Sequence, residues 1–163
     1  MNKIISFVMV GTNDLEKSSK FYDAIFIHLG LKKVTTTERY IGYSHSDDPH
    51  EVEFYITRPY NKELATTGNG TMVALLAESE EVVKKFYTTA LEKGAKDEGS
   101  PGIREDGNYY AYIRDIDGNK ITVKCVVNWI KTQQKFTIIG PEKWVFTIEC
   151  DNSIKYLGSY IYS

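Results

Sequence analysis

The residue types best suited to catalysis or metal binding are few in this sequence, and their spacing matches no reactive motif. His45 and His50 flank the polar turn SHSDDPH, and His28 lies at the end of a predicted helix. Metal ligands need fixed positions supported by further hydrogen bonds, so solvated loop histidines are favoured over a surface metal motif in this turn. Ser44 and His45 are adjacent on a predicted strand and therefore point to opposite faces. The sequence thus shows no nucleophile–base pair, and no glycine pattern suited to cradling a phosphate.

The predicted elements run strand, helix and several strands, and this order occurs twice. The first half has a strand at 4–10, a helix at about 15–29 and strands at 31–36, 39–45 and 51–57. After a polar linker at 60–70, the second half has a strand at 71–77, a helix at 78–93, a short extended piece and a hairpin at 109–125. Asn13 or Asp14 is the predicted N-cap of the first helix, and Gly30 its end. A duplicated βαβββ unit explains this order better than a doubly wound sheet, because consecutive short strands need hairpins.

Composition restricts the class of protein. The 163 residues fit one domain, or one domain with an appendage, and 42% hydrophobic residues suffice for a packed core. A net charge of −2 gives no electrostatic reason to expect nucleic-acid binding, and no stretch has the length of a membrane helix. The short apolar run at the N-terminus lacks a cleavage site and is interpreted as mature structure. Cys125 and Cys150 form no CxxC pattern, which predicts two reduced thiols in a cytoplasmic protein.

Three segments resemble one superfamily. "VGTNDLEKSSKFYDAIFIHLGLKKV" (10–34) is similar to the opening of glyoxalase/bleomycin-resistance domains, the vicinal oxygen chelate superfamily. "RPYNKELATTGNGTMVALLAESEEVVKKFYTTALEKGAKDEGSPG" (58–102) is similar to their linker and second module. "YYAYIRDIDGNKITVKC" (109–125) resembles their closing hairpin, with its aspartate-x-aspartate-glycine-asparagine turn. The resemblance covers residues 1–125.

The resemblance implies an α+β fold in which two βαβββ modules, at about 1–60 and 69–125, curl around a central cavity with the helices outside. Many members hold a divalent metal there on two histidines and a glutamate. The corresponding positions here are Phe7, Met72 and Thr122. A phenyl ring, a soft thioether and a neutral hydroxyl do not suit a hard divalent ion. We therefore expect a domain without a metal or other cofactor.

Strand alternation predicts which side chains line that cavity. The set is mostly aromatic and thioether, with two opposite charges: Phe7, Met9, Glu53, Tyr55, Met72, Ala74, Tyr110, Tyr112, Thr122 and Lys124. Such a lining favours a flat or apolar ligand held by stacking and a few hydrogen bonds. The alternative is that these side chains fill the space as a closed core.

Three charged residues have alternative interpretations. Glu53 could act as a general base if burial raised its pKa, but a rim position or pairing with Lys124 is the stronger interpretation. Arg58 and Arg104 could bind an anionic group at the mouth of the cavity, although surface solvation is the simpler expectation for each. No catalytic residue is assigned.

Two functions of different class follow from the resemblance. The first is a metal-independent protein that binds a small, partly aromatic molecule, as bleomycin-resistance members do. The second is an enzyme of the lactoylglutathione-lyase or dioxygenase kind, which the missing ligands disfavour. Because two-module chains of the family commonly pair, a homodimer is expected in either case.

Residues 126–163 form an extension outside the repeated unit. KFTIIG, WVFTIE and YLGSYIYS favour strands, and Trp144, Phe146 and Ile148 alternate along one face. An isolated hairpin is marginal in water, so these strands are expected to be ordered by docking on the first domain or on a partner chain.

Overall fold

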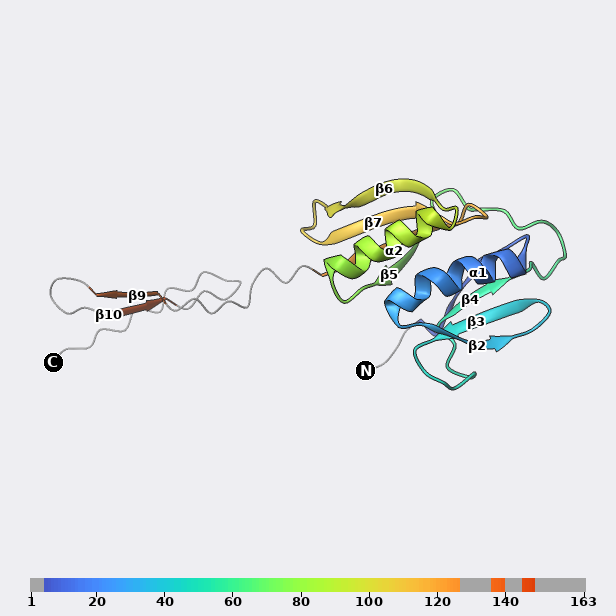
Figure 1. The fold of residues 1–163 in the computed structure, drawn as a ribbon, viewed down its shortest axis with the longest axis horizontal. Helices are drawn as coiled ribbons and strands as arrows, with labels where there is room; N and C mark the ends of the chain where they lie inside the picture. Colours follow the sequence, from blue (N-terminus) through green and yellow to red (C-terminus); the bar gives the residue numbers. More distant parts are fainter. Residues whose placement is uncertain (1–4, 127–135, 140–144, 149–163) are drawn as a thin grey trace. The chain divides into compact units, whose positions relative to one another are not determined.

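The computed structural model describes residues 5–126 and two strands of the extension, 136–139 and 145–148 (Figure 1). Contacts divide the chain into residues 1–127 and 128–163, and each unit is treated by itself. Among the described residues, no helix has the length and apolar character needed to cross a membrane.

The first module forms a mixed four-stranded sheet with one helix, here called sheet 1. Its elements are β1 (Val8–Gly11), α1 (Leu15–Phe26), the 3₁₀ turn η1 (Ile27–Leu29), β2 (Lys32–Thr36), β3 (Tyr40–Ser44) and β4 (Phe54–Thr57). The strand order is β1-β4-β3-β2, with β1 and β4 parallel and the other pairs antiparallel.

The second module repeats this arrangement as sheet 2. Its elements are β5 (Val73–Leu76), α2 (Glu80–Glu92), β6 (Lys96–Ile103), β7 (Tyr109–Arg114) and β8 (Lys120–Cys125). The order β5-β8-β7-β6, with β5 and β8 parallel, matches that of sheet 1. The predicted α+β fold of two βαβββ modules is confirmed. Over the described residues the two sheets stay separate and do not close on one another.

Local chemistry fixes the helix ends. The Asp14 side chain caps α1 by accepting a hydrogen bond from the Lys17 backbone N–H at 3.0 Å, which selects Asp14 from the two predicted caps. Gly30 ends η1 with φ at +73°, a conformation that glycine adopts without strain. The predicted strand at 4–10 begins only at Val8, because its partner β4 begins at Phe54 and the two residues are paired.

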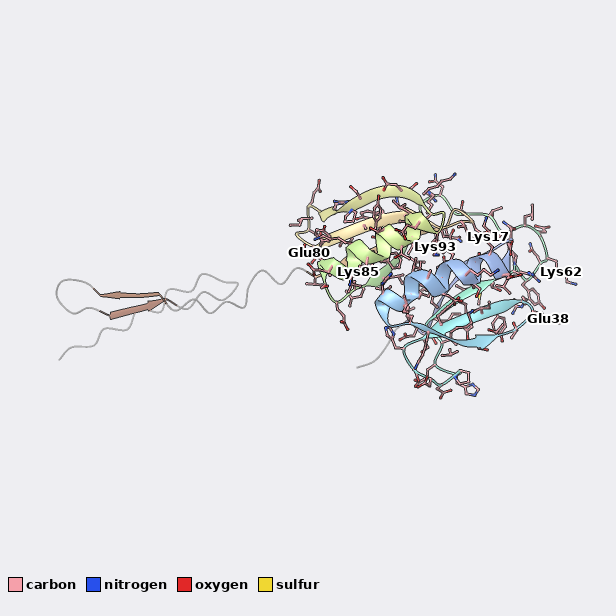
Figure 2. The ribbon with its side chains drawn as sticks, viewed as in Figure 1. Lys17, Glu38, Lys62, Glu80, Lys85 and Lys93 are labelled. Carbon is pink, nitrogen blue, oxygen red and sulfur yellow. The ribbon has the colours of Figure 1, made fainter. Side chains whose placement is uncertain are left out.

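The helices pack against one another and share one core. Figure 1 shows α1 and α2 side by side; α1 contacts β2, β3 and β4, while α2 contacts β6, β7 and β8. On α1, Tyr22 and Phe26 are fully buried and meet the rings of Tyr43 and Phe54 at centroid distances of 4.9–6.4 Å. Exposed lysines such as Lys85 lie on the outer surface of the helices (Figure 2).

The turn at 115–119 joins the two modules. Asp115 is buried and accepts a hydrogen bond from the Tyr22 hydroxyl at 2.6 Å. The Asp117 carboxylate accepts from the Asn13 backbone N–H at 2.9 Å and from the Ser18 hydroxyl at 2.8 Å. Asp117 therefore fixes the start of α1, and Asp115 holds Tyr22 further along the helix, both about a hundred residues away in the sequence.

The described residues of the extension form an antiparallel strand pair, β9 (Phe136–Ile139) and β10 (Val145–Ile148). These strands lie within the predicted KFTIIG and WVFTIE segments. Trp144, Cys150 and the YLGSYIYS segment lie outside the described residues, as does the predicted docking of the extension.

Candidate functional site

Each sheet has one face covered by its helix and an opposite face, here called its open face. On β7, Ala111 and Ile113 are buried in the core shared with α2. Because side chains alternate along a strand, Tyr110 and Tyr112 lie on the open face of sheet 2, where both are half-buried.

The two tyrosines form a parallel pair. Their ring planes differ by 6° and their centroids are 5.8 Å apart. The Tyr110 hydroxyl donates to Asp106 at 2.5 Å, and the Lys124 ammonium donates to the Tyr110 oxygen at 3.1 Å. The hydrogen bonds from Tyr110 and from Asn108 lower the pKa of Asp106 to about 2. These contacts fix the orientation of Tyr110, with Lys124 5.1 Å from its ring centroid.

Two further cations lie over Tyr112. The Arg104 guanidinium is 5.5 Å and the Lys120 ammonium 5.7 Å from the ring centroid. Glu98 accepts from Arg114 at 2.7 Å and pairs with Lys120 at 3.0 Å, and the Arg114 hydrogen bond lowers the pKa of Glu98 most. The predicted site set omits Lys120 and Arg114. Strand alternation could have identified both residues. Lys120 is two residues from Thr122 and Arg114 two residues from Tyr112, and residues two apart on a strand lie on the same face.

Thr122 stands in β8 between Ala74 of β5 and Tyr112 of β7. It is fully buried, and its hydroxyl donates to the Ala111 carbonyl at 2.9 Å. Its side chain thus satisfies the backbone of the neighbouring strand.

On sheet 1, aromatic rings gather around Tyr55. Its ring meets Phe7 at 5.1 Å and Tyr40 at 5.5 Å, both edge-on. Burial raises the pKa of Tyr55. Phe7 and Met9 remain 49% and 45% exposed, so apolar surface is left open beside these rings.

Glu53 and Lys124 have different neighbours. Glu53 pairs with His45, whose Nδ1 lies 2.5 Å from the carboxylate, while His45 Nε2 lies 3.0 Å from the Leu29 carbonyl oxygen. Lys124 lies against Tyr110 on the other sheet.

The predicted site residues therefore fall into two groups, one on each sheet. Met9 and Tyr55 belong to sheet 1, with Phe7 and Glu53 just before its strands β1 and β4, and Tyr110, Tyr112, Thr122 and Lys124 belong to sheet 2. Met72 lies just before β5 and is 46% exposed. A hollow of about 190 Å³ between the modules includes Met9 and Lys120 in its lining. A larger one, of about 690 Å³, contains none of the predicted residues but includes Arg58.

The residues at the family's metal positions do not fit a divalent cation. Phe7 has no donor atom, Met72 offers only a thioether, and the Thr122 hydroxyl is engaged by a backbone carbonyl. Within residues 5–126, no group of three or more His, Cys, Asp or Glu side chains is arranged to hold a metal.

Comparison with known proteins agrees with this fold. The profile of the Glyoxalase/Bleomycin resistance protein/Dioxygenase superfamily matches residues 4–123. A glyoxalase/bleomycin resistance protein from Albidiferax ferrireducens T118 is 39% identical, with a TM-score of 0.69, over 76% of this chain and 99% of that chain. Comparison with curated proteins gives no match.

More distant structures share the fold alone. A lactoylglutathione lyase from Agrobacterium tumefaciens is 17% identical, with a TM-score of 0.57, over 78% of this chain and 97% of its own. A fosfomycin resistance protein from Mesorhizobium loti is 15% identical, with a TM-score of 0.56, over 78% and 96%. The repeated modules, the closing turn and the matched profile together show that this chain belongs to the glyoxalase/bleomycin-resistance/dioxygenase superfamily.

Proposed function

We propose that this chain is a metal-independent small-molecule binding protein whose ligand lies against the open faces of the sheets. The observation that carries the proposal is the parallel pair Tyr110 and Tyr112, flanked by Arg104, Lys120 and Lys124. Rings and cations hold a flat ligand by stacking and charge, without metal coordination.

The alternative is an enzyme of the lactoylglutathione-lyase or dioxygenase kind, which superfamily membership supports. A metal-dependent reaction of that kind needs nitrogen or oxygen donors at the positions of Phe7, Met72 and Thr122. The three side chains present are weaker metal ligands than two histidines and a glutamate.

Residues 1–125 are proposed to carry the function. A cytoplasmic location is proposed because Cys125 is a free, buried thiol.

A thermal-shift screen of flat aromatic compounds, run with and without EDTA, tests the proposal. A ligand at a hundred times its Kd adds about 2.7 kcal/mol to the free energy of unfolding, so binding raises Tm. We expect the same shift with and without EDTA, and its loss in Tyr112→Ala. Tyr60→Ala, at a tyrosine 87% exposed in the linker, is the matched control and should keep the shift. Binding abolished by EDTA would favour the enzyme, and shifts unaffected by Tyr112→Ala would contradict the site.

We also propose that the protein forms a homodimer, because the open faces leave apolar surface uncovered within one chain. Phe7, Met9 and Met72 are all 45–49% exposed, and a second copy could cover them. We expect light scattering to give about twice the 18.6 kDa mass of one chain. Phe7→Glu should shift the mass towards the monomer, whereas Leu64→Glu, at an 80% exposed linker position, should not. A monomer mass for the unaltered protein at micromolar concentration would contradict the dimer.

A further inference from the structure

The open face of sheet 2 carries more positive than negative charge, although the whole chain has a net charge of −2. Arg114, Lys120, Lys124 and Glu98 come from its strands, and Arg104 and Asp106 reach the tyrosine pair from the turn between β6 and β7. Glu98 is shared by Arg114 and Lys120, which leaves the other two cations on either side of the tyrosine pair.

Arg104 keeps donors available for a ligand. Its guanidinium donates to the Ser100 carbonyl at 2.7 Å and to the Ile103 carbonyl at 3.4 Å. In the described part of the chain, no ion pair includes it. A guanidinium has five N–H donors in a planar fork, so further donors remain for an oxygen pair. Arg104 is thus a cation held in place by neutral carbonyls.

The backbone makes room for this arrangement. A Cβ added at Gly102 would lie 2.9 Å from Arg104 Nη1, and one added at Gly99 would lie 3.0 Å from Tyr112 Cδ2. Gly99 also has φ at +158°. The two glycines of β6 therefore let the guanidinium and the ring lie close to the strand.

We propose, as an extension of the proposed function, that the open face of sheet 2 binds a planar aromatic carboxylate, with its ring on Tyr110 and Tyr112 and its carboxylate on Arg104. Aromatic rings gain from edge-to-face contact with tyrosine, and a carboxylate matches the guanidinium fork in a bidentate pair. A cationic ligand is disfavoured because Arg104, Lys120 and Lys124, which lie over the two rings, would repel it. The surplus positive charge complements the anion.

Three probes with one ring system separate charge from stacking. Calorimetric titrations use 2-naphthoate, 2-naphthamide and 2-naphthylmethylammonium, which are anionic, neutral and cationic. We expect naphthoate to bind about tenfold more tightly than naphthamide, and the cation to bind least, because hydrogen bonds to charged groups are the stronger ones. Arg104→Gln should weaken naphthoate about tenfold and change naphthamide less than about twofold.

Lys85→Gln is the control, since it removes the same charge from an exposed position on α2 (Figure 2) and should change neither probe. Arg104→Lys keeps the charge but loses the fork, so an intermediate affinity is expected, and this variant serves if Arg104→Gln fails to fold.

Equal binding of naphthoate and naphthamide, or equal effects of Arg104→Gln and Lys85→Gln, would overturn the anion specificity while leaving aromatic binding in place. Tightest binding of the cation would overturn it as well. Binding of none of the three probes at millimolar concentration would also overturn this inference. The proposed function would then still be tested separately, by the thermal-shift screen with Tyr112→Ala.

Discussion

Replacing Asp115 with alanine is expected to lower the free energy of unfolding by about 4 kcal/mol, because a buried charged acceptor is removed from its donors. The carboxylate accepts from the Tyr22 hydroxyl, from the Asp117 backbone N–H, and from both the backbone and side-chain amides of Asn119, at 2.6–3.0 Å. Alanine leaves these groups without their acceptor. Urea unfolding followed by circular dichroism measures the loss.

Asp47→Ala is the matched control, since that side chain is 93% exposed and, within the described residues, forms an ion pair with Lys32 alone. Exposed ion pairs contribute about 0–1 kcal/mol, so a small change is expected. A loss below about 1 kcal/mol in Asp115→Ala would show that the turn does not hold the modules together.

Alkaline pH is expected to destabilise the protein steeply, because burial raises the pKa of both Tyr22 and Tyr43. In the unfolded chain a tyrosine loses its proton near pH 10. The folded protein keeps these protons to higher pH, so the native state binds more protons and the free energy of unfolding falls as pH rises. The contribution is complete below about pH 10 and is lost by about 1.4 kcal/mol per pH unit for each buried tyrosine above it.

Tyr43→Phe separates this effect from the titration of other groups. The variant loses the hydroxyl that donates to Asp23 at 2.9 Å, so its stability at neutral pH should be lower. Between pH 10 and 11 its slope should be shallower than that of the unaltered protein by about 1.4 kcal/mol per pH unit. Equal slopes in the two proteins would contradict the assignment.

The sequence predicted what local chemistry determines. The cap at Asp14 and the end at Gly30 depend on neighbouring backbone groups, so the extent of the first helix followed from residue types. Strand alternation similarly placed Tyr110 and Tyr112 on one face.

Residue types and strand alternation could not predict contacts between residues far apart in the sequence. The roles of Asp115 and Asp117 depend on contacts with Tyr22 and Ser18 of α1, about a hundred residues away, so the turn motif alone did not reveal them. The position of Arg104 over Tyr112 depends on the path of β6 past Gly99 and Gly102, which hydrophobic periodicity does not specify.

The joint between the modules has a consequence for partial unfolding. A chain built from two like units could open one unit while the other stays intact. Here, opening the second module would withdraw the acceptors of Asn13, Ser18 and Tyr22, and would uncover the side of α1 that α2 contacts. Opening either half therefore costs nearly as much free energy as opening both, and residues 5–126 should behave as one cooperative foldon rather than two.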